Sequence, residues 1–380
     1  MDHFFSPEQV LLRDTVRRFA RERIAPMAAE IDRTDKFPRA LYREMGEMGL
    51  FGVALPESAG GAGMDTLTAC LIMEEIACGA GAVGNMYALP VESALMLHTH
   101  GNEVHKKWIP KLLDGTAIPA TAVTEADAGS DVAGMRTVAR LDGDSYVING
   151  SKAWVTFGGV CDFVLVFAKT SSEHGNHNIS CFFVECDRPG IRRGINEELM
   201  GMHGLEDCEM SFDNVRIPVE NRLGPDNQAF RMAMTNFNVG RLLMASMALG
   251  MTRAAFEDAQ SYARDRKQFG QPINNFQAIQ FMLADMATEM DASRLLIHQG
   301  ARMHDMGLPF AKQASQAKMF TTDMAMKNVS NALQIHGGAG YSRHFRIERI
   351  FRDVKLSQIY EGTNQIQRLI IARQLAKEAA

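Results

Sequence analysis

The chain has 380 residues, of which 46% are hydrophobic and 22% charged, with a formal net charge of −5. These values are typical of a globular protein and leave room for two or three domains. The acidic balance excludes a broad basic surface for nucleic acid or anionic membranes. No apolar run approaches the roughly 18–20 residues that a membrane span needs.

Cysteine usage and the N-terminus predict a reducing compartment. The six cysteines form no C-x-x-C pair, so neither a disulfide framework nor a zinc site is expected; they are Cys70, Cys78, Cys161, Cys181, Cys186 and Cys208. The first ten residues, MDHFFSPEQV, lack the cationic and apolar regions of a secretory signal. We therefore expect a cytoplasmic protein of bacterial type, or a mitochondrial matrix protein if the chain is a mature eukaryotic form.

Residues 1–116 are predicted to be helical. Ser6-Pro7-Glu8-Gln9 is a helix-start signal, with Ser at the N-cap, Pro at N1 and Gln at N3. Further helical patterns cover about 64–78, 88–100 and 103–113. The glycine-rich stretch 60–63 predicts a loop between them.

Residues 117–224 change to short β-rich runs, which cover about 118–124, 145–148, 153–156, 163–167 and 179–184. Asn149-Gly150 is a strong signal for a two-residue hairpin turn between two of these runs. Turn residues recur every ten or so positions, as in a small sandwich or barrel.

Residues 225–380 return to helix. Long runs rich in Ala, Met, Leu and Gln cover about 226–263, 275–306 and 309–336, and short connections predict an antiparallel four-helix bundle. The predicted fold class is α+β, mostly α, with three domains: helical 1–116, β 117–224 and helical 225–380. This order is not the alternating βαβ of a dinucleotide-binding fold.

Common catalytic motifs are absent: the chain has no phosphate-binding P-loop, no G-x-S-x-G elbow and no H-E-x-x-H metal motif. Two other stretches each allow a binding role or a plain structural one. The segment 123–131 offers hydroxyls and backbone N–H groups to a polar ring or phosphate, or is a capped turn. In 153–159, Trp154 and Thr156 are expected on one face of a strand, where they suit a flat heterocycle, or Trp154 is a core residue.

Two further stretches lie at predicted helix ends. Cations in 264–272 suit a phosphate, or they complement the dipole of a solvated helix end. The glycines in 334–341 permit close approach of a ligand, or they cap the helix.

The last notable stretch runs from Ser357 to Leu369. Tyr360-Glu361-Gly362-Thr363 interrupts a helical pattern, and Thr363 is a good residue to start the next helix. Glu361 therefore stands in a gap between two helices, with no nearby Lys or Arg in the sequence. Alone, it reads as a solvated loop carboxylate.

Together these stretches resemble the acyl-CoA dehydrogenase family along nearly the whole chain. The segments T-E-x-x-A-G-S-D, W-V-T-x-G-G, R-x-x-F-G-x-P-I, Q-x-x-G-G-x-G and Y-E-G-T-x-x-I-Q follow in the family's order. The resemblance implies non-covalent FAD, a homotetramer, an acyl-CoA substrate and an electron-transfer flavoprotein as acceptor. The family's FAD contacts match Thr121, Val123, Thr124, Gly129, Ser130, Trp154, Val155, Thr156, Arg266, Gln268, Phe269, Phe276, Gln277, Gln334, Gly337, Gly338, Thr363 and Gln365.

The resemblance also assigns the chemistry. Glu361 matches the catalytic base that removes the α-proton of the thioester while the β-hydrogen leaves as hydride to flavin N5. Ser130, Asn238, Arg241 and Gly362 match the substrate side. Some members carry the base just before the matching Arg, but that position here is Gly240, which leaves Glu361 and suggests room for a branched or cyclic acyl group.

One departure from the family is visible. The family usually has Pro in the first segment, where this chain has Ala126-Asp127. A missing Pro lowers loop rigidity, and Asp127 is either an added surface charge or a specificity element. The resemblance leaves open an enoyl-CoA reductase, an acyl-CoA oxidase, a desulfinase-like enzyme or a non-catalytic scaffold of the same fold. It does not indicate the acyl chain.

Overall fold

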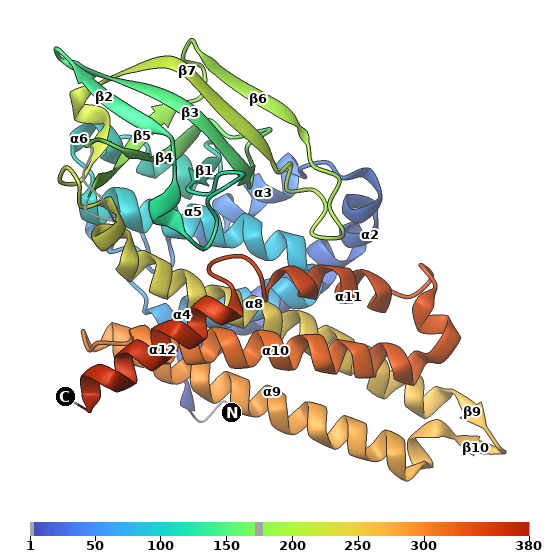
Figure 1. Cartoon of the computed structure of the whole chain (residues 1–380). Coiled ribbons are helices and arrows are strands. Elements are labelled where there is room, and N and C mark those ends of the chain that lie inside the picture. The colour runs from blue at the N-terminus through green and yellow to red at the C-terminus, as the bar shows by residue number, and fades with distance from the viewer. Residues whose placement is uncertain (1–3, 172–177, 380) are drawn as a thin grey trace.

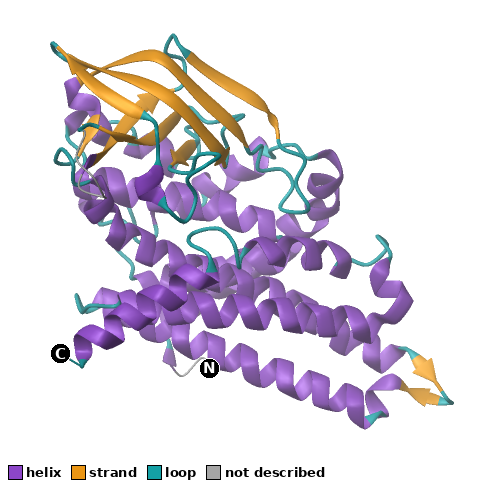
Figure 2. Cartoon of the chain, in the orientation of Figure 1, coloured by secondary structure: helices purple, strands orange, loops and turns teal. Residues whose placement is uncertain are grey.

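The computed structural model describes residues 4–171 and 178–379. Helices form most of it, and one curved sheet lies at one end (Figure 2). The order along the chain is helices, then strands, then helices, as the sequence predicts (Figure 1). The mostly helical α+β class is therefore confirmed. No helix among the described residues is long and apolar enough to span a bilayer.

The N-terminal part is helical. Ser6 and Gln9 form the predicted capping box: the Gln9 N–H donates to the Ser6 hydroxyl, and the Ser6 N–H to the Gln9 side chain. A π-helical turn, Ala20–Ile24, joins the first two helices. The helices are α1 (Pro7–Phe19), α2 (Ala25–Thr34), α3 (Arg39–Glu47), α4 (Thr66–Gly79), α5 (Gly81–His100), α6 (Glu103–Lys106) and α7 (Ile109–Leu113).

The strands of the middle part join one sheet in the order β6-β7-β3-β2-β4-β5-β8, with β1 paired to β4. Strands β4 and β5 are continuous apolar runs that are buried along almost their whole length, which is typical of strands covered on both faces. The strands are β1 (Pro119–Ala122), β2 (Val138–Asp142), β3 (Ser145–Val155), β4 (Phe163–Lys169), β5 (Ile179–Glu185), β6 (Ile191–Asn196), β7 (Cys208–Pro218) and β8 (Arg222–Leu223).

The hairpin predicted at Asn149-Gly150 is wrong. Asn149 and Gly150 lie inside β3, where the pairing with β7 shifts register and forms a bulge. A Cβ at Gly150 would collide with Thr137, so only a glycine lets the backbone lie this close to Thr137. The hairpin turn is Gly143-Asp144, between β2 and β3, because Asp142 pairs with Ser145. Gly143, at the first turn position with φ +63°, is the residue that such a two-residue turn favours.

The C-terminal helices agree with the predicted runs to within about three residues at their ends. They are α8 (Ala229–Asp265), α9 (Gln277–Asp305), α10 (Ala311–His336), α11 (Ile347–Leu356) and α12 (Asn364–Glu378). A two-residue hairpin, β9 (Lys267–Gln268) and β10 (Gln271–Pro272), projects from the end of α8 and α9 (Figure 1). Its turn residues, Phe269 and Gly270, both have positive φ, as a tight hairpin turn requires.

One continuous core joins the three parts. The same buried cluster contains Met86 of α5, Val155 of β3 and Met247 of α8. Helices α4 and α5 pack against α8, and the loop between α11 and α12 lies close to the middle of the bundle on the side of the sheet (Figure 1). This packing places Glu361 where helices and sheet meet.

Candidate active site

The loop that carries Glu361 is a sharp break between two helices. Helix α11 ends at Leu356, and Thr363 caps α12 by accepting from the Ile366 N–H at 3.3 Å. Glu361 has φ +53° and Gly362 φ +86°. A left-handed backbone is uncommon for Glu and costs free energy, so the surrounding structure must hold it. Within the described residues, the Glu361 backbone N–H has no hydrogen-bond acceptor.

Two buried side chains fix this loop through hydrogen bonds to its carbonyl groups. Lys318 of α10 donates through Nζ to the Gly362 carbonyl at 2.9 Å and to Asn364 Oδ1 at 3.0 Å. Gln367 of α12 donates through Nε2 to the Gly362 carbonyl at 2.9 Å and to the Glu361 carbonyl at 3.3 Å. Both side chains are fully buried. Sequence reasoning missed them, because a Lys or Gln in a helix is almost always a surface residue.

Burial raises the pKa of the Glu361 carboxyl above its ordinary value, and the cations of Arg241 and Lys318 oppose this rise. The carboxylate forms no ion pair among the described residues, yet two cations lie near enough to affect it. No Lys or Arg lies near Glu361 in the sequence, and the cations that act on its carboxyl come from α8 and α10, 120 and 43 residues earlier in the chain. The net effect is that the Glu361 carboxyl is a weaker acid than an exposed glutamate.

A second carboxyl, Glu92 of α5, shares this site. Burial and the nearby charge of Glu361 raise its pKa well above the ordinary value. Glu92 also lies beside Gly240, because a Cβ at Gly240 would meet Glu92 Oε1 at 3.0 Å. The side of Gly240 on which the sequence predicts room for a branched acyl group therefore faces the Glu92 carboxyl. No sequence signal pointed to Glu92.

Asn238 and Arg241 lie on the same stretch of α8, and both are buried. Arg241 Nη1 donates to Asn238 Oδ1, whereas Arg241 Nε has no partner among the described residues. Burial lowers the Arg241 pKa. A buried guanidinium with an unused donor is suited to a polar ligand.

Thr156 follows β3 and donates its hydroxyl proton to Asp207 Oδ1 at 2.6 Å. Burial raises the pKa of Asp207 to about 6. The charge of Asp207 contributes to the raised pKa of Tyr360, the residue before Glu361. Thr156 and Asp207 therefore lie on the same site as the Glu361 loop. Since the Thr156 proton points to Asp207, the hydroxyl lone pairs are free to accept from a ligand N–H.

Trp154 and Thr156 do not share the face of a regular strand, so that prediction is wrong. The pairing of β3 with β7 shifts between Lys152 and Val155, and Trp154 has φ +57°, which breaks the alternation of side chains. Trp154 is 58% exposed and is not a core residue. An exposed indole next to a hydroxyl still suits a flat ligand.

The loop after β1 is held by a buried ion pair. Lys152 Nζ donates to Glu125 Oε1 at 2.8 Å and to the Val123 carbonyl at 2.9 Å. Glu125 also accepts from the backbone N–H groups of Arg136 and Thr137. Thr121 and Val123 are half-buried on either side of Ala122, where β1 ends, Thr124 follows, and Gly129 and Ser130 are exposed. Sequence reasoning missed Lys152.

The predicted residues of the β9–β10 hairpin and of the start of α9 lie away from Glu361. Arg266, Gln268 and Phe269 are exposed on the β9–β10 hairpin at one end of the bundle (Figure 1). Phe269 is 92% exposed and meets Phe276 edge to face. Gln277 begins α9 and is exposed.

The other predicted residues lie at the end of α10 and at the start of α12. Gln334 is exposed in the last turn of α10, and Gly337 caps that helix with φ +58°. The space where Gly337 and Gly338 would carry a Cβ is open. Gln365 is exposed in the first turn of α12, two residues after Thr363.

The residues present suit a flat, anionic cofactor and a polar thioester. Among the described residues, the Glu361 N–H and Arg241 Nε have no partner, and Trp154, two residues before Thr156, is exposed. In the described part of the chain, no three His, Cys, Asp or Glu side chains gather as a metal site would require.

Comparison with known proteins gives the family. Three family models match: the N-terminal domain of acyl-CoA dehydrogenase at 6–116, the middle domain at 120–215 and the C-terminal domain at 227–376. An acyl-CoA dehydrogenase of Bacillus subtilis is 44% identical over 370 residues, which cover 97% of this chain and 98% of the relative.

Two further relatives extend the comparison. The Caffeyl-CoA reductase-Etf complex subunit CarC of Acetobacterium woodii is 36% identical over 378 residues, 99% of this chain and all of that one. The structure of butyryl-CoA dehydrogenase from Megasphaera elsdenii superposes with a TM-score of 0.95 at 36% identity, covering 98% of this chain and 99% of that one. The chain therefore belongs to the acyl-CoA dehydrogenase family and is a flavin-dependent oxidoreductase that uses FAD.

Proposed function

We propose that the protein oxidises an acyl-CoA thioester to a 2,3-enoyl-CoA, with Glu361 as the base that removes the α-proton. The observation that carries this proposal is a half-buried carboxyl of raised pKa in a strained loop whose backbone N–H has no acceptor in the described part of the chain. A thioester α-proton is weakly acidic, so a base of raised pKa, held against it, suits the task.

The chain supplies the rest of the site. The free Glu361 N–H is placed to donate to the thioester oxygen, where negative charge develops. Asn238 and Arg241 hold the polar part of the substrate, with Ser130 and Gly362 beside it. Lys318 and Gln367 fix the loop so that the carboxylate and the N–H keep one geometry. FAD, when bound, supplies the acceptor for the β-hydrogen as hydride.

The FAD contacts are proposed as two sets. Strand and loop residues 121–130 and 154–156 line the ring of the subunit's own FAD, together with Thr363 and Gln365. Arg266, Gln268, Phe269, Phe276, Gln277, Gln334, Gly337 and Gly338 serve the diphosphate end of a neighbouring subunit's FAD. All of them except the half-buried Phe276 are exposed, and they lie toward one end of the bundle, which supports this division. A site shared in this way requires at least a dimer, and we propose the homotetramer that the family resemblance implies.

The proposed electron acceptor is an electron-transfer flavoprotein. The support is a 36%-identical relative whose name places it in a reductase–Etf complex. That name also favours a second candidate function, reduction of an enoyl-CoA in the reverse direction. The same groups serve both directions, since a base that removes the α-proton returns it in reverse.

The test uses the FAD-loaded protein and a panel of saturated and unsaturated acyl-CoAs. Glu361→Gln is expected to keep bound FAD and to slow anaerobic flavin reduction by the best substrate by about 10²–10⁴-fold. Glu92→Gln, which changes the neighbouring buried carboxyl, is the matched control and is expected to stay within about tenfold of the parent. Near-normal reduction in Glu361→Gln, with loss in Glu92→Gln, would reverse the assignment.

Direction and acceptor are tested separately. Dye reduction with saturated acyl-CoAs supports the dehydrogenase. Reoxidation of the reduced protein by enoyl-CoAs, without dye reduction by saturated ones, supports the reductase. Rapid reoxidation of the substrate-reduced protein by air would indicate an oxidase.

A further inference from the structure

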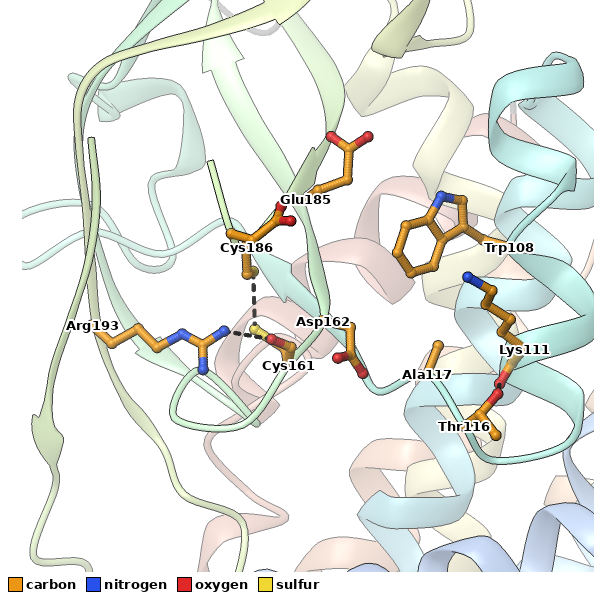
Figure 3. Close-up of a pocket in the computed structure, with 10 residues that line it drawn as sticks. Trp108, Lys111, Thr116, Ala117, Cys161, Asp162, Glu185, Cys186 and Arg193 are labelled. Carbon is orange, nitrogen blue, oxygen red and sulfur yellow. Dashed lines mark hydrogen bonds between the residues drawn. The ribbon is translucent and has the colours of Figure 1, made fainter. Parts of the chain in front are cut away.

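Two cysteines lie side by side at the edge of a surface pocket in the β part of the molecule. The pocket has a volume of about 470 Å³, and Cys161, Cys186 and Arg193 line one side of it (Figure 3). The sulfur atoms of Cys161 and Cys186 are 3.4 Å apart. Glu361 and its loop do not line this pocket, so it is separate from the proposed active site.

The sheet brings the two cysteines together across 25 residues of sequence. In the antiparallel pair of β4 and β5, Phe163 lies opposite Glu185. The ladder continues one step further, because the Cys186 N–H donates to the Asp162 carbonyl at 2.9 Å. Cys161 comes just before Asp162, so it sits diagonally across from Cys186 at the strand ends. The absence of a C-x-x-C motif therefore gave no hint of this pair.

The pair is asymmetric. Cys186 is half-buried and Cys161 is fully buried. The hydrogen bond between the two thiols and the charge of Arg193 lower the pKa of the Cys186 thiol, whereas burial and Asp162 oppose this change. The same hydrogen bond, with burial, raises the Cys161 pKa well above its ordinary value. A more exposed thiol of lowered pKa beside a buried partner is typical of an attacking and a resolving cysteine.

The other four cysteines differ. Cys70, Cys181 and Cys208 are buried, Cys78 is half-buried, and burial raises the pKa of each thiol. All six cysteines are free thiols, but only Cys186 has a lowered pKa. Thiolate character governs reactivity with peroxides, so Cys186 is set apart chemically.

Arg193 also ties the pair to the loop that precedes it. Its Nη1 donates to the Gly159 carbonyl at 2.9 Å, and its Nη2 donates to the Cys161 carbonyl at 2.6 Å. The loop 157–161 follows Thr156 directly and is pinned on its other side by the Gly159 N–H, which donates to the Glu206 carbonyl. Cys161 is thus held in place facing Cys186.

We propose that Cys161 and Cys186 form a reversible disulfide site that takes a small peroxide as its oxidant. The Cys186 thiolate attacks one peroxide oxygen, the O–O bond breaks, and Cys186 becomes a sulfenic acid while the other oxygen leaves as hydroxide. Cys161 then attacks that sulfur, an S–S bond forms, and water leaves. Overall, two thiols and one hydrogen peroxide give one disulfide and two waters, so the thiols lose two electrons and the peroxide gains them. Bond formation requires the sulfurs to approach by about 1.4 Å, to the usual S–S length.

The experiment uses the FAD-loaded full chain with a small excess of hydrogen peroxide. Wild-type protein is expected to lose about 2 Da and two of its six alkylatable thiols, and to regain both with dithiothreitol. A digest without reductant should yield one cross-linked peptide pair, Cys161–Cys186. Cys186 should also react at least about tenfold faster than Cys78, the other half-buried thiol.

Variants separate the two roles. Cys161→Ser is expected to leave a sulfenic acid on Cys186 that dimedone traps, whereas Cys186→Ser should show neither trapping nor cross-link. Cys78→Ser is the matched control and should form the cross-link at the parent rate. The proposal is overturned if wild-type protein keeps six free thiols after exposure, or if Cys78 oxidises first. The wild-type digest decides this even if a variant does not fold.

Discussion

The Glu361 loop and the β9–β10 hairpin both carry proposed cofactor or substrate residues, and they are built in opposite ways. The loop has a strained backbone that Lys318 and Gln367, both fully buried, hold through its carbonyls. The hairpin presents Arg266, Gln268 and Phe269 to solvent, and Phe269 touches only the edge of Phe276 among aromatic rings of the described chain.

The difference shows which part of the site one chain can complete. A catalytic base must be held close to the one C–H bond that it breaks. Its loop is therefore fixed by groups of the same chain. An exposed aromatic and two polar residues on a projecting turn gain little for the single subunit, since they bury little surface. We therefore expect mutations in the loop to change stability and chemistry, and mutations in the hairpin to change cofactor retention.

Lys318→Met is expected to have the largest effect on stability. It removes the hydrogen bonds of Lys318 to the Gly362 carbonyl and to Asn364 Oδ1, which then keep only the bonds from Gln367 and Thr322. We expect the free energy of unfolding to fall by about 2 kcal/mol, measured by urea denaturation of the FAD-loaded protein. Lys327→Met, also on α10, breaks a pair between Lys327, which is 55% exposed, and Glu289 of α9; it is the control and should cost under about 1 kcal/mol.

The same variant should move the pH dependence of flavin reduction. Glu361 must be ionised to act as a base, so the rate falls as pH drops through its raised pKa. The Lys318 cation lowers that pKa, and its loss therefore raises it. Rapid-mixing measurements between pH 5 and 8 should show the acid limb of the rate profile shifted to higher pH. An unmoved or lowered limb would mean that Lys318 does not act on Glu361.

Phe269→Ser tests the hairpin. We expect FAD to bind about tenfold more weakly because an aromatic contact is lost, while the unfolding of the single subunit is unchanged. Fluorescence of FAD released on dilution measures the affinity. Ile195→Ser on β6 is matched, since Ile195 is 89% exposed and Phe269 92%, and it should retain FAD like the parent. Equal retention in both variants would remove the hairpin from the cofactor site.

The sequence predicted the long helices and the family motifs well because both depend on local patterns. The helix start at Ser6 and the cap at Thr363 follow from neighbouring residues alone. The fold also brings together residues that no local pattern links: Lys318 below the loop, Glu92 beside Gly240 and Lys152 against Glu125. Their side chains look like surface residues in the sequence and are buried only by contacts far along the chain.

Failures in the β part have a related cause. Alternation predicts facing side chains only in a regular strand, and the register shifts of β3 at Ile148 and Lys152 break it twice. Asn149-Gly150 gives the same signal for a hairpin turn and for a bulge, because both use glycine's freedom. The partner strand β7 decides between them, and it lies about 60 residues later.

Asp127→Ala is expected to have the smallest effect and tests the loop after β1. Asp127 pairs with Arg136 at 3.3 Å, but the two side chains are 72% and 81% exposed, so the pair contributes under about 1 kcal/mol. Two residues earlier, Glu125 forms the buried pair with Lys152. The loop is therefore held by Glu125, and Asp127 is a surface charge.

For Asp127→Ala we expect the free energy of unfolding, the FAD affinity and the KM across the acyl-CoA panel to be unchanged. A raised KM for one acyl-CoA, at unchanged stability, would instead make Asp127 a specificity element, and would mean that exposure in the single chain does not separate structural from substrate-binding residues.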